Sequence, residues 1–115
     1  MFMIAFAADT SKKLPRVVCR KLYHCAVIVP RGDILMMYQF TRPGRIARIR
    51  LTARDLRILG RHGWYYIYLN AAPIRHFDRG RIYTCVHLAK RAVGLRAWGI
   101  QTPYGLYKYL RRRVQ

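Results

Sequence analysis

The first half of the chain carries apolar patterns typical of β-strands. Residues 2–8 form a continuous apolar run, which predicts a buried strand. A β-prone stretch over 23–29 is followed by turn residues at 30–33 and by a second apolar stretch over 34–40, which together predict a hairpin. Basic and apolar residues alternate over 45–51, which indicates a half-exposed strand with arginines on its outer face.

A short helix and another strand are predicted next. Thr52 and Asp55 have the spacing of a capping box, with Asp in place of Glu, and Gly60 is expected to close the helix that follows. Aromatic and aliphatic residues at 64–69 predict a strand, and 70–80 is expected to be a loop.

Two helices are predicted in the last third. The first covers 85–93 and ends at Gly94. The second begins after Thr102 as N-cap, with Pro103 at its first position, and continues into the arginines at 111–113. Strands and helices in this order predict an α+β domain, a small antiparallel sheet packed by helices.

Composition indicates a folded and very basic protein. The 115 residues are expected to form a single domain, 1–115, with a basic C-terminal tail. Lysine and arginine total 23 against 4 acidic residues, and the net charge is +19. All acidic residues are aspartates, so a glutamate base and a carboxylate-rich metal site are excluded. The charge indicates a polyanionic neighbour, or alternatively a proteome in which arginine is the default surface residue.

The cysteines indicate free thiols. There are three, Cys19, Cys25 and Cys85, so at least one is unpaired within a monomer, and a reducing compartment is the simpler interpretation. No CxxC pair is present, so we do not expect a zinc ribbon. We also expect no cofactor. The apolar residues 1–8 are interpreted as a strand and not as a targeting segment, and we expect no membrane span.

Cys85 is the candidate nucleophile. It stands at a predicted helix start with basic residues on both sides, a setting that favours the thiolate. The alternative is a small buried apolar side chain, as free cysteine often is. A base would come from a histidine distant in sequence, and the residues alone do not choose among the four present: His24, His62, His76 and His87.

Three segments resemble a family of small proteins from tailed phages and prophages. They are the H-C-A-V stretch in 24–33, the T-C-V-H-L-A-K-R-A-V-G-L stretch in 83–95, and T-P-Y-G-L-Y-K-Y-L in 101–110. That family in turn resembles the circularly permuted NlpC/P60 papain-like group, which includes the lecithin-retinol-acyltransferase-like proteins. In that group the histidine strand comes before the cysteine helix, as it does here.

The resemblance implies a permuted papain-like fold with Cys85 as nucleophile and His24 as base. The strand after the histidine strand should supply a group that orients the ring. Related proteins carry a histidine there; this chain has Gln39 as first choice and Tyr38 as second. The backbone N–H of Cys85 would form part of an oxyanion hole. The implied activity is a cysteine hydrolase or acyltransferase acting on an amide or ester, with cell-wall peptide (peptidoglycan) as the natural substrate, in a virion or the bacterial host cytoplasm.

The alternative is a non-catalytic phage virion or assembly protein whose basic surface faces nucleic acid or another polyanion. The arginines of 45–50 and 111–113 would provide the charge. Tyrosines would stack on bases or simply pack within the fold, and the candidates are Tyr65, Tyr66, Tyr68, Tyr104, Tyr107 and Tyr109.

Overall fold

The computed structural model describes residues 1–8, 22–96 and 99–113, and Cys19 lies outside them. In chain order, the elements are β1 (Phe2–Ala8), β2 (Leu22–Arg31), β3 (Ile34–Arg42), β4 (Arg45–Leu51), α1 (Ala53–Arg61), β5 (Trp64–Leu69), α2 (Cys85–Val93) and α3 (Pro103–Arg113). The strands form one five-stranded sheet in the order β4-β3-β2-β1-β5, with every neighbouring pair antiparallel. The prediction of an α+β chain with a small antiparallel sheet is confirmed.

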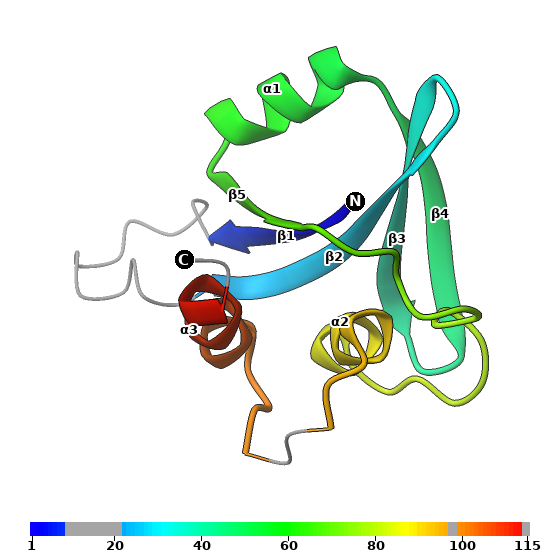
Figure 1. The fold of residues 1–115 in the computed structure, drawn as a ribbon, viewed down its shortest axis with the longest axis vertical. Coiled ribbons are helices and arrows are strands. Elements are labelled where there is room, and N and C mark those ends of the chain that lie inside the picture. The colour runs from blue at the N-terminus through cyan, green and yellow to red at the C-terminus, as the bar shows by residue number, and fades with distance from the viewer. Residues whose placement is uncertain (9–21, 97–98, 114–115) are drawn as a thin grey trace.

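Helices cover both faces of the sheet (Figure 1): α1 lies on one side, and α2 and α3 lie on the other. Successive strand residues point to opposite faces, so β1 and β2 fill two cores at once. On β2, Val27 packs with Leu88 and Leu106 towards α2 and α3, while Ala26 and Ile28 face the α1 side. Helices on both faces therefore explain why residues 2–8 form an unbroken apolar run and do not alternate.

The capping box of α1 is present. The Asp55 N–H donates to Thr52 Oγ1 at 3.2 Å, and the Thr52 N–H donates to Asp55 Oδ2 at 2.8 Å. The prediction that Gly60 closes this helix is wrong, because the helix continues to Arg61. The left-handed glycine that follows the helix is Gly63, with φ of 93°, and its N–H donates to the carbonyl of Gly60.

The ends predicted for the other helices are confirmed. Thr84 caps α2, since its Oγ1 accepts from the His87 N–H at 2.9 Å. Gly94 ends that helix in the left-handed conformation, with φ of 80°. Thr102 caps α3, where its Oγ1 accepts from the Gly105 N–H at 3.0 Å. These local signals fix where α2 begins in the chain, with Cys85 as its first residue.

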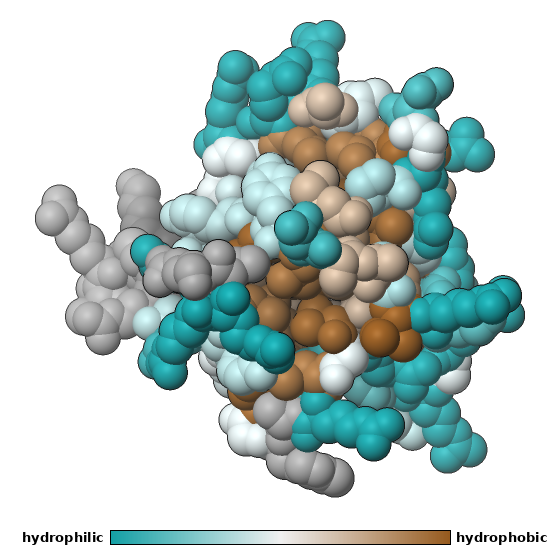
Figure 2. All heavy atoms as spheres, viewed as in Figure 1, coloured by the Kyte–Doolittle hydropathy of each residue, from teal (hydrophilic) through white to brown (hydrophobic). Residues whose placement is uncertain are grey.

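The basic side chains lie mostly at the surface. Figure 2 shows hydrophilic side chains around the rim of one face and apolar surface at its centre. On the edge strand β4, Arg48 and Arg50 are exposed as expected, and Arg48 also pairs with Asp78. Residues 111–113 form the last turn of α3. Over the described ranges, no helix combines the length and the apolar character needed to cross a membrane.

Candidate active site

The candidate site lies where two neighbouring strands part. Pairing of β2 with β3 runs from their hairpin turn to Val27 and Tyr38. Beyond that pair, β2 continues along β1, and β3 continues along β4. The register of β1 with β2 also shifts beside His24, and such irregularities often redirect a side chain. His24 of β2 and Gln39 of β3 meet across the opening.

Gln39 holds the imidazole of His24. Its Nε2 lies 2.9 Å from His24 Nε2. The oxygen and nitrogen of a glutamine side chain can exchange places by a half-turn of the amide group. When the imidazole carries both protons, Gln39 Oε1 can therefore face the ring and accept from His24 Nε2–H. Contact through Nε2 leaves Nδ1 as the ring nitrogen for another partner. The indole of Trp64 on β5 meets the imidazole edge to face, with ring centroids 6.1 Å apart.

Cys85 reaches this site from the first residue of α2. Its half-buried side chain forms hydrogen bonds with the Cys25 thiol and with His24. The bond from Cys25 lowers the pKa of Cys85 most, burial opposes it, and His24 lowers it further, to about 4. The structure therefore brings together all three residues singled out from the sequence, Cys85, His24 and Gln39, with Cys85 as the thiolate at neutral pH.

Cys25 is a fourth member of the site. Its side chain is fully buried, and its hydrogen bond with Cys85 together with burial raises its pKa well above the ordinary value. Cys25 therefore keeps its proton and donates it towards the sulfur of Cys85, so the negative charge resides on the thiol nearer to solvent.

Sequence reasoning missed Cys25 and Trp64. In the sequence, Cys25 was considered only as one of three thiols, and it was given no role at the site. The available signal was the series Cys25, Val27 and Val29, whose apolar side chains face the layer that contains α2. No local signal in the sequence pointed to Trp64.

The start of α2 adds positive potential beside the sulfur. Thr84 accepts the N–H of His87 through its hydroxyl at 2.9 Å and the N–H of Leu88 through its carbonyl at 3.1 Å. The N–H groups of Cys85 and Val86 come earlier, where a helix has no internal acceptors for them. These groups suit the stabilisation of an oxyanion next to Cys85.

The remaining histidines have other places. His87 Nδ1 accepts from the Tyr83 N–H at 3.3 Å, and the two rings stack. Burial lowers the pKa of His87, and Arg91 and Lys90 lower it further. His62 is exposed after α1, and His76 is exposed in the loop before α2.

A pocket of about 470 Å³ lies along α2, and neither Cys85 nor His24 is among its lining residues. Thr84, Val86 and His87, from the same helix turn as Cys85, form one wall, and Lys90, Arg91 and Arg96 make it basic. Within the residues described, no group of three histidine, cysteine or acidic side chains gathers as metal ligands would.

No protein family, curated protein or solved structure matches the chain. The chemistry of the site is therefore judged from its geometry: a thiolate at a helix start, an imidazole in contact with it, and an amide that orients the ring.

Proposed function

We propose that the protein is a cysteine hydrolase or acyltransferase of the permuted NlpC/P60 type, acting on an amide or an ester. Cys85 is the nucleophile, His24 is the general acid and base, and Gln39 orients the ring. The observation that carries the proposal is the chain of contacts from Cys85, whose pKa is about 4, to His24 and on to Gln39.

In the first half-reaction, the Cys85 sulfur attacks the carbonyl carbon of the substrate. The carbonyl oxygen takes up negative charge beside the N–H groups at the start of α2. Protonated His24 then gives its proton to the leaving nitrogen or oxygen as that bond breaks, leaving a thioester on Cys85.

In the second half-reaction, neutral His24 takes a proton from water, or from an acceptor hydroxyl or amine. The acceptor oxygen or nitrogen attacks the thioester, and Cys85 leaves as the thiolate. The pair of thiolate and imidazolium is restored, with Gln39 Oε1 accepting from the ring Nε2–H.

For the substrate we propose the peptide of a bacterial cell wall, in a phage-associated setting in the virion or the host cytoplasm. Support comes from the sequence resemblance and from the basic residues of α2, Lys90 and Arg91, which suit a substrate that carries carboxylates.

The pH dependence of alkylation tests the nucleophile. Iodoacetamide labelling of Cys85, followed by mass spectrometry, should be nearly independent of pH between about pH 5 and pH 8, because the thiolate is already formed. His24→Ala removes one of the groups that lower the pKa of Cys85, so the labelling rate should begin to depend on pH, although the Cys25 hydrogen bond still favours the thiolate. A wild-type rate that rises about tenfold per pH unit up to pH 8 would contradict the proposal.

A trapped acyl-enzyme tests catalysis. The protein is mixed with an activated ester and analysed by intact mass, and the acyl adduct should map to Cys85. His24→Gln should slow both formation and decay of the adduct. A Cys85→Ser variant controls for acylation at other side chains. An equal amount of acyl adduct on that variant would contradict the assignment of Cys85 as the nucleophile.

A second candidate is a non-catalytic virion or assembly protein that binds a polyanion, favoured by the surface of α3. Cations stand over three tyrosine rings of this helix: Lys108 over Tyr104 at 5.3 Å, Arg111 over Tyr107 at 6.0 Å and Arg113 over Tyr109 at 5.5 Å. Cations beside aromatic rings are the combination that single-stranded nucleic acid favours. This candidate predicts DNA binding that weakens steeply with salt and is unchanged in Cys85→Ala. Absence of binding at low salt would remove it.

A further inference from the structure

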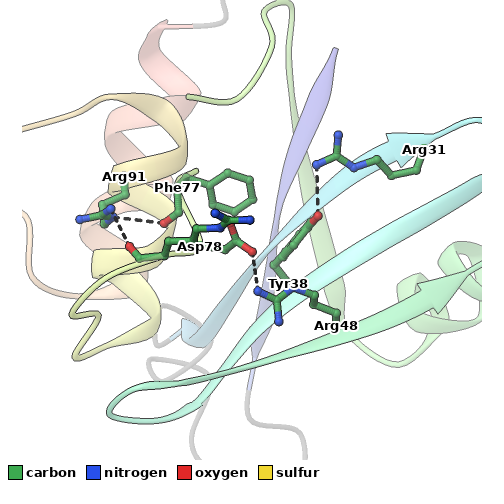
Figure 3. A network of polar contacts seen from close by, with 7 residues as sticks. Arg31, Tyr38, Arg48, Phe77, Asp78 and Arg91 are labelled. Atoms are coloured by element: carbon green, nitrogen blue, oxygen red, sulfur yellow. Dashed lines mark hydrogen bonds and ion pairs between the residues drawn. The ribbon is translucent and has the colours of Figure 1, made fainter. Parts of the chain in front are cut away.

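A second pocket lies away from the thiol site, between the β3–β4 edge of the sheet and the loop that precedes α2. It has a volume of about 600 Å³. Tyr38 and Arg48 line it from the sheet, Arg31 lines it from the end of β2, and residues 72–79 form the opposite wall. Figure 3 shows the sheet residues facing that loop.

The charge of this pocket is unbalanced. Four arginines line it, Arg31, Arg48, Arg75 and Arg79, together with His76 and a single acidic residue, Asp78. Asp78 is already engaged, since its Oδ2 lies 2.6 Å from Nη2 of Arg48 (Figure 3). The other three lining arginines therefore have no lining carboxylate of their own, and like charges around one concavity repel. A bound anion would relieve that repulsion.

The loop wall of the pocket is held in place. Arg91 of α2 donates from Nε to the Phe77 carbonyl at 3.1 Å and from Nη2 to the Arg79 carbonyl at 2.7 Å. Phe77 is buried, and its ring packs edge to face on Tyr38, with centroids 4.9 Å apart. His76 adopts a left-handed conformation, with φ of 60°, which is uncommon outside glycine. A loop fixed in this way presents its arginines without a large cost of ordering on binding.

Tyr38 provides a donor at the base of the pocket. Its hydroxyl oxygen accepts from Arg31 Nη2 at 3.1 Å. A hydroxyl that accepts one hydrogen bond still has its own proton to donate. The pocket thus offers guanidinium forks and a hydroxyl, all of which are hydrogen-bond donors.

We infer that this pocket binds a phosphate group, held by Arg31, Arg75 and Arg79 with the Tyr38 hydroxyl beneath it. A carboxylate is satisfied by one guanidinium fork, whereas a phosphate presents more oxygens and more charge, which suits several arginines converging on one concavity. The inference does not depend on Cys85, because the pocket shares no lining residue with the thiol site.

The test titrates inorganic pyrophosphate into the full-length chain at low salt, followed by calorimetry and by NMR of the backbone amides. We expect saturable binding at one site, with the largest amide shifts at 72–79. Arg75→Gln combined with Arg79→Gln should weaken binding at least about tenfold. Tyr38→Phe, which keeps the ring that packs on Phe77, should weaken it severalfold.

A matched control separates the pocket from general attraction to a basic protein. Arg57→Gln combined with Arg61→Gln removes the same charge from α1, on the other face of the sheet, and should change the affinity less than about twofold. Equal weakening in both double variants, shifts spread over all basic surfaces, or an absence of binding would overturn the inference.

A second experiment distinguishes two sources of the phosphate, a nucleic-acid end and a small phosphate compound. Short single-stranded oligonucleotides with and without a 5′ phosphate are compared on the wild type and on the pocket variant. A gain from the 5′ phosphate that disappears in the pocket variant identifies a nucleic-acid end as the ligand. Pyrophosphate binding without such a gain identifies a small phosphate compound.

Discussion

Cys25 and Cys85 are two thiols in contact, and their surroundings give them opposite protonation. The hydrogen bond from Cys25 is the largest cause of the low pKa of Cys85. Cys25→Ala removes this donor, so the pKa of Cys85 should rise and its alkylation at pH 6 should fall by about tenfold. Cys25→Ser retains a donor and should keep most of the rate. If both variants are alkylated at the wild-type rate, the Cys25 hydrogen bond does not set the pKa of Cys85, and His24 alone does.

In the proposed reaction, Gln39 acts through His24, so it is a positioning residue. Gln39→Ala removes the contact at 2.9 Å and frees the imidazole to rotate. Turnover of an activated ester should fall by up to about 100-fold with little change in KM, because the loss affects the chemical step. Gln39→Glu places a carboxylate on the ring and should move the pH–rate profile to higher pH. An alanine variant with wild-type turnover would leave Gln39 without a role in catalysis.

The sequence allowed this group of residues to be predicted only in part. Cys85, His24 and Gln39 were named from the order of the motifs, while Cys25 was given no role. Its contact with Cys85 depends on how α2 packs across β2, where β2 has already left β3. That arrangement joins residues sixty positions apart, and no local pattern encodes it.

Among the elements, α2 carries both the proposed nucleophile and the cap that fixes its first turn. Thr84→Ala removes the acceptor for the His87 N–H and should lower the free energy of unfolding by about 1 kcal/mol, measured by urea denaturation. Alkylation of Cys85 should also slow at low pH, because the first turn loosens. Thr84→Ser should restore both, and Thr102→Ala on α3 should lower stability without changing the alkylation. A Thr84→Ala variant with normal stability would show that the cap contributes nothing.

Helix ends were predicted correctly wherever the sequence offered a single capping residue. Gly94 and Thr102 mark helix ends that the structure confirms, because caps act within one turn. Gly60 misled the prediction, since two glycines lie near the end of α1 and the sequence does not show which adopts a positive φ. Gly63 does so, and Gly60 remains in the helix.

At the scale of the whole molecule, the order of strands and the pockets are products of long-range pairing. The strand content of the chain was predictable, whereas the sheet order β4-β3-β2-β1-β5 was not, because it places the first strand between the second and the last. The phosphate pocket has the same origin. Its walls come from the sheet and from the loop before α2, and only the fold brings their arginines together.

The net charge of +19 should make stability rise with salt, because few acidic groups offset the repulsion among cations. One repulsive pair is defined by the sheet: Arg42 of β3 lies directly opposite Arg45 of β4. Arg42→Gln should raise the free energy of unfolding by about 0.5 kcal/mol at low ionic strength and by little in 0.5 M NaCl, which screens the pair. Arg57→Gln on α1 lowers the net charge equally without relieving a cross-strand pair, and it should stabilise less. Thermal denaturation of the wild type and both variants at the two salt concentrations tests these expectations. Equal gains in stability for the two variants would assign the repulsion to net charge and not to the cross-strand pair. A wild-type melting midpoint that falls with added NaCl would contradict the expected rise of stability with salt.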